Sequence, residues 1–385
     1  MKKFFSILIV VLLLSSLIVG CSSEGASSEE ESDVIKIGVF EPLTGANAAG
    51  GEMEVEGIEL ANEMFPEVLG KKVELVKADN KSEKVEAANA ATYLIDKENV
   101  LAIIGSWGSS LSMAAGPIAE DNQIPVVAPS ATNPLVTEGN DWYFRVCFID
   151  PFQGKVMANY AYKELGAKTA AIVQEVSNDY SVGLAKFFTD SFKELTGDDN
   201  AILDTVSYNT QDTDFTAQLT SIKEQNPDVI FAPGNYTESA LLTKQARDLG
   251  IDIPILGGDT WETPEFIDIA KDDAEGVVLS TFYTTEVPIT SMSETFLDAY
   301  REKYDKEPAA VTALGFDAYL VILEAIERAG TTDPVAIKEE IAKTSGFEGA
   351  AGVVTLDENG DATKNAIIKQ VKNGQFEYLA TVEPE

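Results

Sequence analysis

Short apolar runs alternate with amphipathic runs along most of this chain. The first apolar run covers residues 34–40, and residues 51–65 then place apolar side chains at the spacing of one helix face. The alternation continues with a strand at 73–77, a helix at 83–97, a strand at 101–104, a helix at 110–121 and a strand at 125–128. Because several of these strands are apolar throughout, the pattern predicts a parallel sheet with helices on both faces.

A second series of the same kind follows residue 150. It predicts strands at 169–174, 202–207, 229–231, 254–256 and 277–282, with helices at 181–195, 215–224 and 238–249 among them. Two such series indicate two similar lobes, each a doubly wound α/β unit.

The pattern changes after residue 283 to three helices without strands between them, at 293–304, 311–329 and 335–343. Final strands are predicted at 353–356, 367–371 and 376–381. Three helices that follow two complete α/β units are expected to cover an existing lobe rather than form a third domain. The chain is therefore expected to cross between the lobes more than once.

The N-terminal residues have the pattern of a secretory signal peptide over residues 1–20. Lys2 and Lys3 precede an apolar run, and small residues stand before Cys21. The ending Ile18-Val19-Gly20-Cys21 resembles the lipobox of bacterial lipoproteins, which implies a lipid on Cys21 and a membrane-anchored, extracytoplasmic protein. An ordinary signal peptide or an uncleaved anchor is the alternative. Residues 22–33 have no aromatic or branched apolar side chain, so 21–33 is predicted to be a flexible tether.

Composition excludes several classes of function. The 385 residues include 64 acidic and 28 basic ones, a formal charge of −36 that repels nucleic acid and anionic lipid headgroups. The absence of histidine excludes Ser-His-Asp and Cys-His nucleophile pairs and histidine metal sites. Two cysteines are too few for a Cys-rich zinc site, and Cys147 is expected to be a small core residue. Neither a metal nor a cofactor is expected.

Catalytic motifs are missing from the loops where they would be needed. The sequence has no Gly-x-Gly-x-x-Gly fingerprint after its first strand, no Walker loop and no Gly-x-Ser-x-Gly elbow. The acidic residues in the strand-end loops are scattered rather than paired as in glycosidases. The acidic positions 52, 54, 56 and 59 are expected to form a solvated helix face rather than a metal site. The sequence therefore predicts a binding protein, not an enzyme.

Ligands of parallel α/β sheets bind at the carboxyl ends of the strands. The loops at these ends are 41–51, 105–110, 129–134, 174–180, 234–236 and 257–261. Ser109, at an expected helix start, and Thr132, from the adjacent strand end, could share a carboxylate ligand. Ser110 is expected only to cap its helix.

Three further side chains are candidates for ligand contact from the second lobe. Asp259 follows Gly257-Gly258 and would suit a substrate ammonium group, with a helix N-cap as the alternative. Tyr180 and Tyr236 stand at other strand ends and could bound an apolar pocket, with ordinary surface aromatics as the alternative.

The chain resembles the type I solute-binding proteins of bacterial ABC importers, specifically the leucine/isoleucine/valine-binding family. The resemblance rests on the order of several short segments: 103–105, 109–110, 129–134, 179–185, 214–215 and 245–247. It implies two doubly wound parallel-sheet lobes joined by a hinge that the chain crosses three times. Mapped onto this sequence, lobe 1 takes 34–150 and 286–346, and lobe 2 takes 151–285 and 347–385.

The resemblance also implies roles for individual residues. Ser109 and Thr132 would hold the ligand carboxylate, and the Ser130 carbonyl and the Thr132 hydroxyl would accept from the ligand ammonium. Asp259 would be the counter-charge of that ammonium. The remaining implied contacts are Trp107, Ala49 and the loop residue Ala131 near the ligand, with Tyr180 and Tyr236 closing over it.

The implied function is capture of a small amino acid by hinge closure and its delivery to the permease subunits of an ABC importer. The protein is expected to be monomeric. Two alternatives keep this fold: the ligand is an aromatic acid, a short amide or another small polar solute, or the protein senses a ligand and signals to a partner.

Overall fold

The computed structural model describes residues 34–287 and 289–384. The expected signal peptide, the tether and Cys21 lie outside the described residues. Among the helices of the described part, none combines the length and the apolar character needed to cross a membrane.

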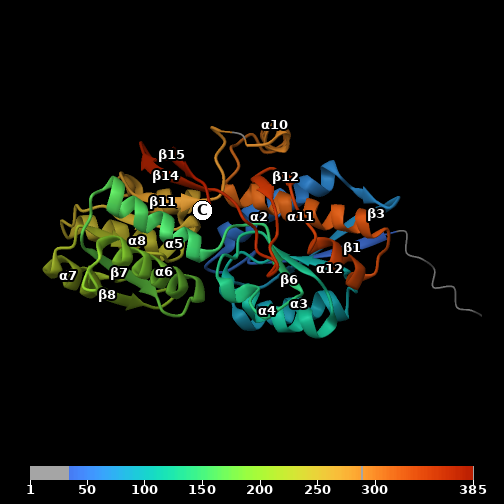
Figure 1. Ribbon diagram of the computed structural model, residues 1–385, viewed down its shortest axis with the longest axis horizontal. Coiled ribbons are helices and arrows are strands. Elements are labelled where there is room, and N and C mark those ends of the chain that lie inside the picture. Colours follow the sequence, from blue (N-terminus) through green and yellow to red (C-terminus); the bar gives the residue numbers. More distant parts are fainter. Residues whose placement is uncertain (1–33, 288, 385) are drawn as a thin grey trace, which may run out of the picture. The chain divides into compact units, whose positions relative to one another are not determined.

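The first sheet has six strands in the order β2-β3-β1-β4-β5-β6 (Figure 1). The strands are β1 (Val34–Glu41), β2 (Glu67–Val68), β3 (Lys71–Asp79), β4 (Ala102–Ile104), β5 (Val126–Ala128) and β6 (Tyr143–Arg145). All neighbours except β2 and β3 pair in parallel, so the carboxyl ends of β1, β4 and β5 lie on one edge. Helix α2 (Ala48–Met64) follows β1, helix α3 (Lys84–Asp96) follows β3, and helix α4 (Ser109–Asn122) follows β4.

The second sheet has seven strands in the order β15-β14-β11-β10-β9-β7-β8. They are β7 (Ala170–Glu175), β8 (Ile202–Tyr208), β9 (Val229–Phe231), β10 (Ile255–Gly257), β11 (Val278–Thr281), β14 (Ala366–Lys372) and β15 (Gln375–Val382). Its helices are α5 (Asp150–Asn159), the π-helical turn Tyr160–Glu164, α6 (Asp179–Thr196), α7 (Thr216–Gln225), α8 (Tyr236–Asp248) and α9 (Pro264–Ala270). Strands β7 to β11 are parallel, and β14 and β15 are antiparallel. The predicted α/β fold with parallel sheets is confirmed.

The late helices α10 (Ser291–Tyr304), α11 (Ala310–Ala329) and α12 (Pro334–Ile341) have no sheet of their own. Helix α11 packs along α2 and also contacts β4 and β5 of the first sheet. The helices therefore extend the first lobe, as their position in the sequence suggested. Cys147 is a free, fully buried core residue, again as expected.

The third crossing between the lobes lies later than expected. The hairpin of β12 (Phe347–Gly349) and β13 (Gly352–Val354) was assigned to lobe 2, but it packs on α10 and α11. The buried carboxylate of Asp317 on α11 accepts hydrogen bonds from the backbone of Ala350 and Ala351, which explains this placement. Asp361 also accepts from Thr137 at 2.8 Å. The chain therefore stays with lobe 1 past residue 346, and the other boundaries remain predictions.

Candidate functional site

A cavity of about 420 Å³ lies where strands of both sheets end. Its first-lobe wall comes from the loops after β1, β3, β4 and β5, and its second-lobe wall from the loops after β7, β8, β9 and β10. Its volume is in the range of small-molecule sites. Five residues predicted for the site line it: Trp107, Ser109, Ser130, Tyr180 and Asp259.

Four predicted residues do not line this cavity. Tyr236 joins the lobes instead: its hydroxyl donates to the Ala46 carbonyl at 2.9 Å and accepts from the Ala49 amide at 3.3 Å. Thr132 is fully buried, and its carbonyl accepts from the Asp150 amide at 3.0 Å. Ala131 turns its carbonyl toward the Arg145 guanidinium at 2.6 Å. The predicted ligand contacts of these four residues remain predictions.

Asp259 is a buried carboxylate at the second-lobe wall, with 3% of its surface exposed. It accepts hydrogen bonds from Gln153 Nε2 at 2.7 Å and from the Tyr180 hydroxyl at 2.9 Å. Both donors are uncharged, and burial raises the pKa of Asp259 to about 6. The alternative as a helix cap is excluded, because Thr263 caps α9 by accepting from the Phe266 amide at 3.1 Å.

The start of α4 forms the opposite wall. Ser109 is the first residue of this helix, and its Oγ accepts from the Asn133 amide at 3.1 Å. The first turn of α4 lines the cavity, so the partial positive charge of the helix N-terminus lies at the site. An anion can be held there without a basic side chain.

Hydrogen bonds join the two lobes at the rim of the cavity. Ser110 was predicted to cap α4, but it does not. Its Oγ donates to the Asp179 carboxylate at 2.8 Å and accepts from the Asp179 amide at 2.9 Å. Lys84 Nζ forms an ion pair with the same carboxylate at 2.7 Å. Asn235 Nδ2 donates to Asn47 Oδ1 at 3.0 Å. The cavity is therefore bounded by contacts that exist only when the lobes are close together.

The prediction that Glu54 lies on a solvated helix face is wrong. Glu52 is exposed, but Glu54 is fully buried and accepts a hydrogen bond from Ser130 Oγ. Its side chain lies against Ser130 and Glu41 in the interior, and α11 packs closely on the backbone of α2 at the same residue: a Cβ atom at Gly315 would lie 2.3 Å from the Glu54 backbone carbonyl. Because Ser130 lines the cavity, Glu54 belongs to the site.

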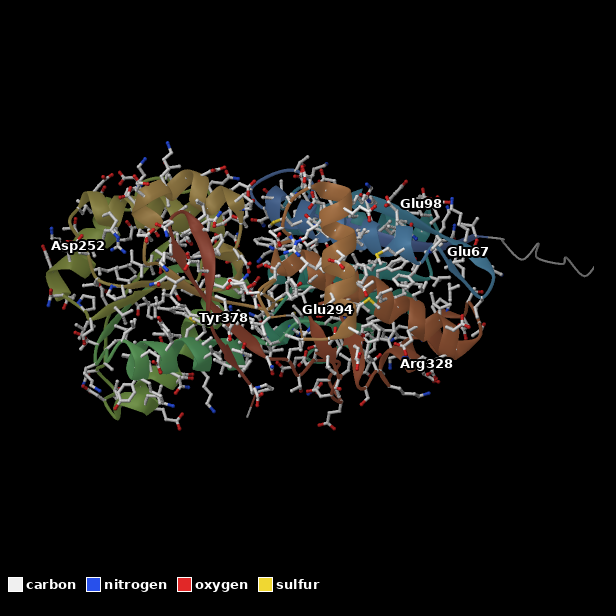
Figure 2. All side chains as sticks on the ribbon, turned by 90° about the horizontal axis from the view of Figure 1, so that it is seen from above. Glu67, Glu98, Asp252, Glu294, Arg328 and Tyr378 are labelled. Atoms are coloured by element: carbon white, nitrogen blue, oxygen red, sulfur yellow. The ribbon has the colours of Figure 1, made fainter. Side chains whose placement is uncertain are left out.

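Most acidic side chains lie elsewhere. Glu67, Asp252 and Glu294 are exposed at the surface (Figure 2). In the part of the chain that the structure describes, no group of three or more acidic or cysteine side chains is placed to hold a metal ion.

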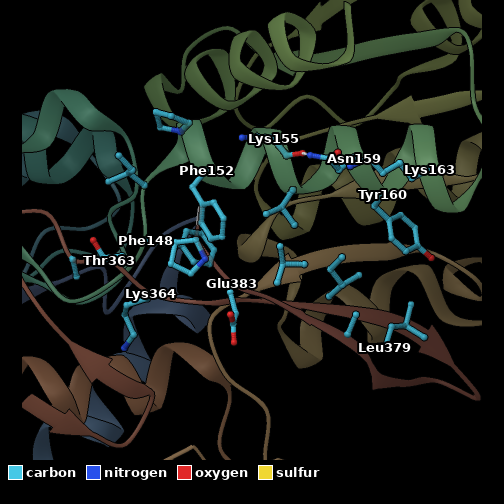
Figure 3. A pocket seen from close by; sticks show the side chains of 18 of the residues that line it. Phe148, Phe152, Lys155, Asn159, Tyr160, Lys163, Thr363, Lys364, Leu379 and Glu383 are labelled. Carbon is cyan, nitrogen blue, oxygen red and sulfur yellow. Dashed lines mark hydrogen bonds between the residues drawn. The ribbon is translucent and has the colours of Figure 1, made fainter. Parts of the chain in front are cut away.

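A second cavity, of about 920 Å³, lies between α5 and the strands β14 and β15 (Figure 3). Phe148, Phe152, Tyr160 and Leu379 contribute to its walls. None of the residues predicted for ligand binding lines it, so the smaller cavity is the candidate site.

The comparison with known proteins identifies the family. Residues 34–375 match the family described as periplasmic binding protein. This chain belongs to that family. It is 30% identical to Leu/Ile/Val-binding protein homolog 3 of Brucella melitensis over 334 residues, which are 85% of this chain and 88% of the relative. It is 28% identical to the leucine-, isoleucine-, valine-, threonine- and alanine-binding protein of Pseudomonas aeruginosa, over 86% of this chain and 87% of the relative.

Two solved structures of binding proteins superpose well on this one. A leucine-binding protein of Thermotoga maritima is 49% identical with a TM-score of 0.88, over 91% of this chain and 99% of that one. A branched-chain amino acid transporter substrate-binding protein of Streptococcus pneumoniae, solved with isoleucine, is 35% identical with a TM-score of 0.85, over 91% and 100%. The predicted family and the type I fold are both confirmed.

Several residues that line the cavity of this periplasmic binding protein were not predicted as site residues from the sequence. Asn47, Asn178, Asn235 and Thr260 contribute polar groups to it. Asn178 Nδ2 lies 3.3 Å from Asn235 Oδ1, and Thr260 Oγ1 donates to the Gly234 carbonyl at 2.8 Å. All four fall in or next to the strand-end loops, so the position of these loops was the available signal.

Proposed function

We propose that this periplasmic binding protein captures an amino acid with a branched apolar side chain in the 420 Å³ cavity. The observation that carries the proposal is Asp259, a buried carboxylate whose hydrogen-bond donors are the uncharged Gln153 and Tyr180. Such a carboxylate favours a ligand that brings its own positive charge.

The opposite wall of the cavity can hold the carboxylate of a zwitterionic ligand. The ligand carboxylate would lie at Ser109 and the first turn of α4, and its ammonium would lie at Asp259. The indole of Trp107, which is 2% exposed, offers an apolar surface for the side chain. The homologues named for leucine, isoleucine and valine support the same ligand class.

Capture would work by hinge closure. A ligand that contacts both walls shifts the equilibrium toward the state in which the lobes meet, since only that state gives both sets of contacts. The bonds from Ser110 to Asp179 and from Asn47 to Asn235 would form in that state. In this proposal the closed, monomeric protein then delivers its cargo to the permease of an ABC importer. A lipid on Cys21 would hold it on the extracytoplasmic face of the membrane.

Calorimetry tests the ligand class directly. The chain from residue 22 onward is titrated with leucine, isoleucine, valine and benzoate. We expect binding of the aliphatic amino acids and none of benzoate, because benzoate lacks the ammonium that Asp259 requires. If benzoate binds and no amino acid does, the proposal is wrong and the aromatic-acid alternative holds.

The affinity for an amino acid is expected to fall in acid. Burial raises the pKa of Asp259 to about 6 in the empty site, so below that pH a proton occupies the carboxylate and competes with the ammonium. The dissociation constant should rise about fivefold between pH values of about 6 and 5 and stay nearly level from about 6.5 to 7.5. Calorimetric titrations across this range measure it, and a constant affinity down to about pH 5 would contradict the role of Asp259.

A further inference from the structure

Two buried carboxyl groups, Glu41 and Glu54, contact each other beside the first-lobe wall of the cavity. Glu41, at the end of β1, and Glu54, on α2, are both 0% exposed. Glu41 Oε2 accepts from the Trp107 amide at 2.6 Å and from Ser106 Oγ at 3.3 Å. Glu54 Oε1 accepts from Ser130 Oγ. The other oxygen of each group, Glu41 Oε1 and Glu54 Oε2, is buried and lacks any such donor.

The two unpartnered oxygens belong to groups that act on each other. The two carboxyl groups are in side-chain hydrogen-bond contact; burial raises the pKa of Glu41, and burial followed by the charge of Glu41 raises the pKa of Glu54 well above its ordinary value. Two adjacent buried carboxylates cannot both be ionised without a cation, and a protonated carboxyl is a hydrogen-bond donor. One proton between the two groups would satisfy both oxygens.

The surroundings of the pair supply no cation that would replace this proton. Asp259 faces Glu54 with a negative charge, and the neutral Tyr143 hydroxyl donates to the Gly105 carbonyl at 2.7 Å. From α11 the neighbours of α2 are the uncharged Thr312 and Gly315, and Asn80 Nδ2 donates to Ser106 Oγ at 2.8 Å.

We infer that Glu41 and Glu54 share one proton, and that this proton-bridged pair is a positioning device for the ligand site. One end of the pair fixes the loop after β4 through Trp107, and the other end fixes the loop after β5 through Ser130. Both loops line the cavity. The consequence for ligand binding rests on the proposed function, whereas the shared proton does not.

Loss of the proton would place two negative charges under the cavity wall and push the two loops apart. The dissociation constant of the wild type should then rise in alkali, by about tenfold for each pH unit beyond the pH at which the pair loses this proton. In a plot of the dissociation constant against pH, the rise in acid (the acid limb) would be caused by Asp259, and the rise in alkali (the alkaline limb) by the pair of Glu41 and Glu54.

The conservative variant Glu41→Gln separates a proton bridge from mere space filling. Its amide can donate to Glu54 without a titratable proton, and its carbonyl oxygen can still accept from Trp107. We expect an affinity at pH 7 within about threefold of the wild type and a weaker alkaline limb. Glu41→Met leaves the Trp107 amide unpartnered and should weaken binding at least about tenfold. The amino group of the ligand titrates identically with each protein, so its effect cancels.

Infrared spectroscopy of the protein with isotope-labelled glutamate detects the proton without any ligand. The wild type at neutral pH should show a protonated glutamate carboxyl band that Glu41→Gln and Glu54→Gln both lack. The exposed Glu52→Gln, on the same helix, is the matched control and should keep both the band and the alkaline limb.

Each possible result decides one of the two proposals. The absence of the band, or the same alkaline limb in Glu41→Gln and the wild type, overturns the proton-bridged pair and leaves amino-acid binding intact. If the wild type binds none of the amino acids, the proposed function fails, and the infrared band alone decides the pair.

Discussion

Replacing Asp259 by alanine is expected to abolish amino-acid binding. The carboxylate is buried at the cavity wall and held by Gln153 and Tyr180, so the variant leaves a buried ligand ammonium without its counter-charge. Removal of one partner of a buried charge pair costs about 2–5 kcal/mol, which corresponds to a loss of roughly 30-fold to several thousand-fold in affinity. Calorimetry with leucine or isoleucine measures the loss.

Two further variants make the Asp259 result specific. Asp259→Asn keeps the shape and one oxygen acceptor but not the charge, and it should bind almost as poorly as the alanine variant. Asp252→Ala removes one negative charge from the exposed surface of the same lobe and should bind like the wild type. Undiminished amino-acid affinity of Asp259→Ala would show that the ammonium lies elsewhere.

The elements that could be predicted from the sequence are those whose pattern is local. The run 34–40 and the helical spacing that follows it correspond to β1 and α2 within three residues at each end. Strand β6 escaped because it is three residues long and ends in Arg145, which is normally a surface residue. Its burial depends on Asp361, a partner far along the chain that no local pattern reveals.

The same limit explains the candidate site. Ser109 and Asp259 were found because their loops follow parallel strands, and topology alone brings such loops to one edge. Glu54 looked like one of several surface acids on a helix, because its side chain is buried against Ser130 and Glu41, which lie on other elements that no local pattern connects to it. Thr132 follows β5 as expected and is fully buried, but it is not among the residues that line the cavity, and its ligand contact stays a prediction. Long-range packing therefore decides which strand-end residues reach a ligand.

Arg145→Met is expected to destabilise the fold more than any surface change. The Arg145 side chain is fully buried, pairs with Asp361 at 2.6 Å and donates to the carbonyls of Ala131 and Asn133 at 2.6 and 3.0 Å. Methionine fills similar space but leaves these acceptors and a largely buried carboxylate without a cation. The free energy of unfolding should fall by about 3–5 kcal/mol, as measured by urea unfolding without ligand.

The control for Arg145 is an arginine whose ion pair is exposed. Arg301 contacts Glu307 at 2.8 Å with 45% and 57% of the two side chains exposed, so Arg301→Met should cost less than about 1 kcal/mol. Adding Asp361→Leu to Arg145→Met should restore part of the stability, because a buried ion pair can be replaced by apolar side chains at little cost. Equal losses for Arg145→Met and Arg301→Met would contradict this account of Arg145. A confirmed difference would mean that the loop carrying Ser130 and Thr132 is held in place by a buried charge at the end of the neighbouring strand β6.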